Sequence, residues 1–173
     1  MRYRIDFQQT HDIDWVGKHG GIPLHVASNG GRIPNVVDSR HNRDLLTQIY
    51  ATEEFLSDDD IVVNKEGIRY LLNHIYEQLR NSNRKGDNVF RIEVTEEMVD
   101  RYAASFVRMA KRGFVSVDRY DYSRFDNTDC IVIAYPKRSL NLVQYWKEQG
   151  DIYENLPAAN IRVYFNNVFH HEY

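Results

Sequence analysis

The residues best suited to chemistry are the histidine and aspartates of the segment His11-Asp12-Ile13-Asp14, together with His25. On a strand, Asp12 and Asp14 project from one face and Ile13 from the other, because successive side chains alternate. If His25 lies opposite them, carboxylates and imidazole could bind a divalent metal that activates water. From the residues alone we favour the alternative, a solvated strand face, and expect neither a metal nor a cofactor.

A glycine-rich segment, Ser28-Asn29-Gly30-Gly31-Arg32, combines backbone amides and an arginine that suit an anion. It matches neither GxxxxGK[ST] nor GxGxxG, and the chain has no HExxH, paired CxxC or EF-hand pattern. No serine lies in a GxSxG setting. We therefore interpret the segment as a turn. The absence of these motifs argues against an enzyme but leaves that question open.

Three further polar features favour structural interpretations. The segment from Asp118 to Asp129 carries four aspartates among arginines and tyrosines but has no glycine, so it predicts a loop neutralised by its own arginines. Cys130 is the first residue of an apolar run, which predicts that it is a small buried hydrophobic residue. The His170-His171 pair lies at the terminus, where residues are usually mobile. None of these features predicts a site.

The elements that would position these residues begin with a β-hairpin over residues 3–27. Tyr3, Ile5 and Phe7 alternate with polar residues, which is typical of a half-buried strand. Further on, Gly20-Gly21 separates two runs with strand character, which predicts a hairpin turn. His25 falls in the second of these runs, across the turn from the aspartates.

The middle of the chain, residues 38–80, predicts helices. Asp38 or Ser39 could cap the first helix, and Asn64 could cap a second one that carries an apolar stripe from Ile68 to Leu79. In the remainder, residues 89–173, Thr95 could cap a helix that ends before Gly113.

That remainder also alternates strands with helices. We expect strands over residues 89–94, 114–117, 130–135 and 161–165, and a short helix around 140–150. The irregular order favours an α+β fold over a doubly wound sheet. We predict a single domain over residues 1–173, with a mixed or antiparallel sheet and three to four helices packed on it.

Composition narrows the class of protein. The chain has 173 residues, 42% of them hydrophobic, with 22 basic against 25 acidic residues and a formal charge of −3. This balance argues against charge-driven binding to nucleic acid or membranes, so we expect neither a membrane nor sequence-specific nucleic acid as a partner. No run resembles a signal peptide, and the single cysteine suits a reducing cytoplasm.

Aromatic content points to contacts with other proteins. The chain has 12 Tyr, 8 Phe and 2 Trp, and tyrosine and arginine are enriched at protein interfaces. The candidate interface residues are Arg108, Lys111, Tyr120, Tyr122 and Tyr153.

Residues 11–15, 25–31 and 105–114 resemble small uncharacterised proteins of tailed phages of gut Bacteroidales, the crAss-like group. The resemblance transfers no functional residues. It implies a virion protein: a non-enzymatic structural subunit of a neck ring or tail connector, assembling into a homo-oligomeric ring. Its partners would be copies of itself and neighbouring virion proteins, first in the host cytoplasm and then in the virion.

Two other functions stay open. One is a metal-dependent phosphodiester hydrolase, a nuclease, using His11, Asp12, Asp14 and His25. The other is a regulatory module that binds a host or phage protein without joining a particle.

Overall fold

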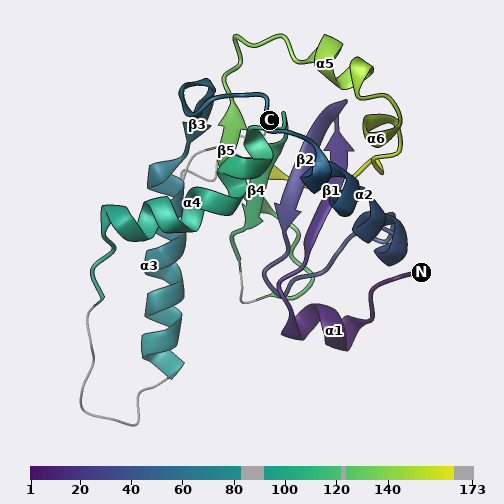
Figure 1. Ribbon diagram of the computed structural model, residues 1–173. Coiled ribbons are helices and arrows are strands. Elements are labelled where there is room, and N and C mark those ends of the chain that lie inside the picture. The colour runs from purple at the N-terminus through teal and green to yellow at the C-terminus, as the bar shows by residue number, and fades with distance from the viewer. Residues whose placement is uncertain (83–91, 122–123, 166–173) are drawn as a thin grey trace.

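A mixed sheet carries helices on one face and irregular segments on the other (Figure 1). The computed structural model describes residues 1–82, 92–121 and 124–165. These residues form a six-stranded sheet in the order β1-β2-β4-β5-β3, with β6 also paired to β5. Its strands are β1 (Asp14–His19), β2 (Ile22–Ala27), β3 (Ile61–Val63), β4 (Val115–Arg119), β5 (Cys130–Pro136) and β6 (Val163–Tyr164). Strands β2 and β4 are parallel, whereas β1–β2, β4–β5 and β3–β5 are antiparallel. The predicted α+β class is confirmed.

The hairpin of β1 and β2 turns at Gly20 and Gly21, as predicted. Both glycines have positive φ, 55° and 83°, a conformation that other residues rarely adopt. The outer edge of β1 is covered, because the Val16 amide donates to Asn42 Oδ1 at 3.0 Å and the Lys18 amide donates to the Pro157 carbonyl at 2.9 Å. Covered edges resist pairing with other strands.

The predicted strand over Tyr3, Ile5 and Phe7 is wrong, because this segment forms the helix α1 (Ile5–Thr10). Ile5 and Phe7 are exposed, so their alternation buries no strand face. The buried residue of α1 is Gln8: its Nε2 donates to the Tyr3 carbonyl and its Oε1 accepts from the Ile33 amide, both at 2.8 Å. A polar anchor to a distant loop therefore decides the local structure.

Three longer helices contact the sheet: α2 (Ser39–Ala51), α3 (Lys65–Ser82) and α4 (Glu96–Ala110). The predicted caps are confirmed for α2, where Asp38 accepts from two backbone amides, and for α4, where Thr95 accepts from the Met98 amide. At the start of α3, Asn64 Oδ1 accepts from the Gly67 amide at 2.9 Å. These caps satisfy amides that lack partners within the helix.

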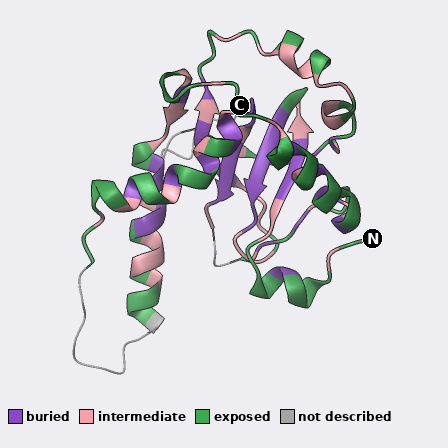
Figure 2. Ribbon diagram, viewed as in Figure 1, coloured by how far each residue is buried: buried purple, intermediate pink, exposed green. Residues whose placement is uncertain are grey.

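Both faces of the sheet are buried (Figure 2). Phe106 and Ile68 pack from the helices onto Ile131 of β5. On the other face, Trp15 and Val117 pack with residues of the irregular segments, such as Ile33 and Ile161.

Several boundaries differ from the prediction. Of the strand expected over residues 89–94, residues 89–91 lie outside the described residues and 92–94 form no strand. The last expected strand shrinks to β6. Helix α5 (Val143–Glu148) confirms the short helix expected around 140–150. The described residues form six α-helices, more than the three to four predicted, because α1 and α6 (Asp151–Glu154) are short additions. None of the helices in the described ranges is both long enough and apolar enough to cross a membrane.

Candidate functional site

Buried polar side chains gather where the parallel strands β2 and β4 run side by side beneath α4. The register pairs His25 with Ser116 and Ala27 with Asp118. Side chains that are paired across neighbouring strands project from the same face of the sheet. This places His25, Ser116 and Asp118 on the face that α4 covers, where polar groups need partners inside the protein.

His25 links Ser116 to an aspartate. Its side chain is only 1% exposed, and its Nδ1 lies 2.6 Å from Ser116 Oγ. Its Nε2 lies 3.5 Å from Asp14 Oδ1 and makes no hydrogen bond. The three residue types match those of a serine nucleophile with its base and acid, but the Ser116 hydroxyl is fully buried. In this conformation a substrate cannot reach it.

Asp118 is the second buried titratable group. Its Oδ2 accepts a hydrogen bond from the Tyr102 hydroxyl of α4, and its Oδ1 has no hydrogen-bond partner. Burial raises the pKa of Asp118 to about 7, outweighing the Tyr102 hydrogen bond, which acts in the opposite direction, and the Asp12 charge raises it further. Asp118 therefore changes charge near neutral pH.

The predicted cluster is only partly brought together. Asp12 and Asp14 line a groove of about 850 Å³ between α1 and α2, and Asp14 lies against His25 across the hairpin. Burial raises the pKa of Asp12, whose Oδ1 accepts from the Asn29 amide at 2.7 Å. His11 is the C-cap residue of α1 and lines the same groove, where its ring stacks on Phe7 with centroids 4.0 Å apart.

These residues do not fit a metal ion. Within residues 1–82, 92–121 and 124–165, no group of three or more His, Cys, Asp or Glu side chains is placed to hold one. Divalent-metal sites of this kind need several oxygen or nitrogen ligands at once. The placement of His11, Asp12, Asp14 and His25 therefore gives the metal-dependent hydrolase no support.

The glycine-rich loop is filled by an arginine of β4. Arg119 Nη2 donates to the Asn29 carbonyl at 3.0 Å, and a Cβ at Gly31 would overlap the Arg119 side chain. The loop amides therefore enclose a side chain of the same protein. Arg119 is a residue that the sequence did not single out, and the only signal for it was a glycine that requires a close neighbour.

Two of the five candidate interface residues have acidic neighbours within the chain. The Lys111 ammonium lies 2.8 Å from Asp58 and 3.7 Å from Glu54, and the Arg108 guanidinium lies 3.7 Å from Glu54. Arg108 is mostly exposed, whereas Lys111 is mostly covered. Lys111 therefore has a structural role before any partner is considered.

Two of the three tyrosine candidates also make contacts within the chain. Tyr153 donates its hydroxyl to the Arg112 carbonyl at 2.8 Å, and burial raises the pKa of Tyr153. Tyr120 is half-buried and lies edge-on to Tyr164, with centroids 5.8 Å apart. Tyr122 lies outside the described residues. Tyr120 and Tyr153 therefore both make contacts within the chain, and their role at an interface stays a prediction.

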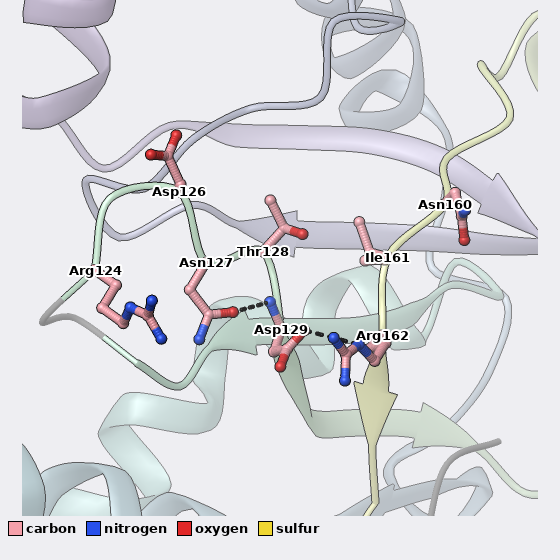
Figure 3. Close-up of a pocket in the computed structure, with 8 residues that line it drawn as sticks. All are labelled: Arg124, Asp126, Asn127, Thr128, Asp129, Asn160, Ile161 and Arg162. Carbon is pink, nitrogen blue, oxygen red and sulfur yellow. Dashed lines mark hydrogen bonds and ion pairs between the residues drawn. The ribbon is translucent and has the colours of Figure 1, made fainter.

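The aspartate-rich loop borders a polar hollow of about 450 Å³ (Figure 3). Arg162 Nε lies 3.5 Å from Asp129 Oδ1, and outside the hollow Arg32 lies 2.7 Å from Asp126. Two of its aspartates, Asp126 and Asp129, therefore pair with arginines of other segments, which the sequence did not predict. The lining residues are Arg124, Asp126, Asn127, Thr128, Asp129, Asn160, Ile161 and Arg162.

Cys130 is buried, as predicted, and burial raises the pKa of its thiol. A thiol of this kind is a poor nucleophile.

Comparison of the chain with protein-family models, with curated proteins and with solved structures finds no match.

Proposed function

We propose that this protein is a non-enzymatic structural subunit of a phage virion, a neck-ring or tail-connector component that assembles into a homo-oligomeric ring. The resemblance of residues 11–15, 25–31 and 105–114 to crAss-like phage proteins supports the viral part. The observation that carries the assembly part is an apolar stripe that continues along α3 beyond the sheet.

The stripe begins in the core and ends at the surface. Ile68 and Leu71 are buried, Ile75 and Tyr76 on the next turn are partly buried, and Leu79 is 53% exposed. In Figure 1, the last turns of α3 extend below the sheet, and Figure 2 shows their burial decreasing along the helix. An amphipathic face is stabilised when another element covers it. In the proposed ring, a second chain packs against the exposed part of this stripe.

An acceptor surface of matching character lies at the opposite end of the molecule. A hollow of about 450 Å³ separates the β1–β2 turn from α5 and α6, and Pro23, Val143 and Trp146 are among its lining residues. Figure 1 places α5 and α6 at the end away from the tip of α3. Contact between two different surfaces of identical subunits can close into a ring.

The charges beside the two surfaces are complementary. Glu77 and Arg80 are exposed on the last turns of α3, while Lys18, Lys147 and Glu154 line the hollow. Charges of both signs on each side allow opposite-charge pairs between adjacent copies, such as Glu77 with Lys147 and Arg80 with Glu154. Such pairs favour one register over others more than they add affinity.

Size-exclusion chromatography with light scattering tests the assembly. We expect an oligomer for the natural chain and a smaller species for Leu79→Asp and for Val143→Asp. Val36→Asp is the matched control: all three side chains are 53% exposed, and Val36 belongs to neither surface. A monomer at high concentration, or equal behaviour of all three variants, would contradict the assembly.

Mass spectrometry of purified virions tests the viral assignment, which predicts stoichiometric amounts of this chain. Its absence from virions would favour the regulatory module. The nuclease keeps its own test, in which labelled DNA or RNA is incubated with the protein and magnesium or manganese. Cleavage that is lost in Asp14→Ala would replace the structural role by that enzyme.

A further inference from the structure

Helix α4 lies on two buried titratable side chains of the sheet. Its Tyr102 donates a hydrogen bond to Asp118 of β4, and the Phe106 ring lies edge-on to His25 of β2, with centroids 6.0 Å apart. Asp118 and His25 are both almost fully buried. Core positions of this kind are usually apolar. Two buried titratable residues beneath one helix therefore indicate a functional role.

Neither group is fully satisfied. Asp118 Oδ1 and His25 Nε2 are buried and have no hydrogen-bond partner. A protonated carboxyl tolerates such a site, because it carries no charge to be hydrated. An ionised carboxylate loses its hydration there, and only hydrogen bonds and nearby cations offset the free-energy cost of that loss.

The groups around Asp118 act in both directions. Tyr102 on α4, the Arg119 amide on β4 and the Asn29 side chain after β2 favour the ionised form. Asp12, before β1, favours the protonated form, as does burial, which is the largest influence. The nearby Cys130 thiol of β5 stays neutral, because burial raises its pKa. The Arg119 guanidinium is engaged with the glycine-rich loop.

We propose that Asp118 and its neighbours form a pH-sensitive contact between the sheet and α4. Helix α4 is held against the sheet while Asp118 is protonated, and it loosens when Asp118 ionises. The inference rests on this buried layer alone and does not depend on assembly. It makes α4 the responsive element, because α4 covers the Asp118 side chain and has to move before water can reach the ionised carboxylate. The Tyr102 hydrogen bond favours the anion and opposes this movement only in part, since burial has the larger influence.

The direction of the response follows from the two pKa values. Asp118 has a pKa of about 7 in the folded protein against 3.8 for a free side chain. A group whose pKa is raised by folding contributes stability that is fully present below the lower value. That stability declines as pH rises between the two values, so α4 is held most firmly in acid and least firmly above pH 7.

Amide hydrogen exchange, corrected for the intrinsic pH dependence of exchange, measures how firmly α4 is held against the sheet. Between pH 5 and pH 8 we expect the protection of α4 amides to fall by about a hundredfold, as the two pKa values require. Protection of α2, which does not contact Asp118, should change little. A pH-independent α4, or an equal fall in α2, would overturn the proposal.

Three variants separate Asp118 from other titrating groups. Asp118→Asn should abolish the pH response, whereas Asp44→Asn, at an exposed carboxyl of α2, should leave it intact. Tyr102→Phe removes a hydrogen bond that favours the anion, so it should move the response to higher pH without removing it. This variant keeps the proposal testable if Asp118→Asn does not fold. A response that persists in Asp118→Asn, or does not shift in Tyr102→Phe, would refute it.

Discussion

The Phe106→Ala substitution tests whether α4 is the principal helix over the sheet. Phe106 is 6% exposed and packs in a cluster with Ala27 and Ile131 of the strands. Its ring also lies against two aromatic neighbours, Tyr102 at 5.7 Å and His25 at 6.0 Å between centroids. Alanine would remove the ring from all of these contacts at once.

The expected loss of stability has three parts. Burying a phenylalanine side chain contributes about 1.5–3 kcal/mol relative to leaving it in water. The cavity left behind raises the total for Phe→Ala to about 3–5 kcal/mol, because the surrounding structure closes only partly. Each lost aromatic contact adds about 0.5–1.5 kcal/mol beyond burial. Since Phe106 has two such contacts, we expect a value near the upper end of that range.

Urea unfolding followed by tryptophan fluorescence measures this loss, with buried Trp15 as a reporter. With a slope of about 2 kcal/mol per M, a loss of about 5 kcal/mol lowers the midpoint by about 2.5 M. Phe7→Ala is the control, because it removes the same ring from a site that is 44% exposed. We expect it to change stability by about 0.5 kcal/mol. Equal losses in the two variants would refute the packing of α4 described above.

Three further substitutions have defined outcomes. Thr95→Ala should cost about 1 kcal/mol in thermal unfolding, since it removes the N-cap acceptor of α4. Gly31→Ala should cost about 1–3 kcal/mol in urea, because the new methyl group displaces Arg119; a neutral result would mean that the loop does not enclose this side chain. Lys111→Glu should lower the melting temperature by about 2–4 °C, because it places a carboxylate beside Asp58, and an unchanged value would restore Lys111 as a purely partner-facing residue.

Much of the secondary structure could be predicted from local patterns. The caps Asp38 and Thr95, the turn at Gly20-Gly21 and the α3 stripe that begins at buried Ile68 all follow from interactions within a few residues. Caps, turns and amphipathic stripes depend on backbone geometry that the local sequence largely controls. These are the elements that the structure confirms.

The segment containing α1 shows where local patterns fail. Alternation of apolar residues predicts a strand only if a neighbouring strand is available to pair with it. Here Gln8 binds the Ile33 amide, 25 residues away in the chain, and the segment becomes helical. The partner, and not the pattern, decided the outcome.

The buried polar layer depended still more on tertiary structure. From the sequence, Asp14 and His25 could be placed on the same face of a hairpin, and the structure brings them within 3.5 Å of each other. Asp118 was expected to begin a loop that is neutralised by its own arginines, because four aspartates alternate there with arginines and tyrosines. Its burial, its altered pKa and its bond to Tyr102 arise only when β4 lies beside β2 and α4 covers both. Sequence alone determined the class of fold and where its three longer helices begin, since helix caps depend on neighbouring residues. The environment of each titratable group was decided by the tertiary structure, because hydration is removed only when distant segments close over it.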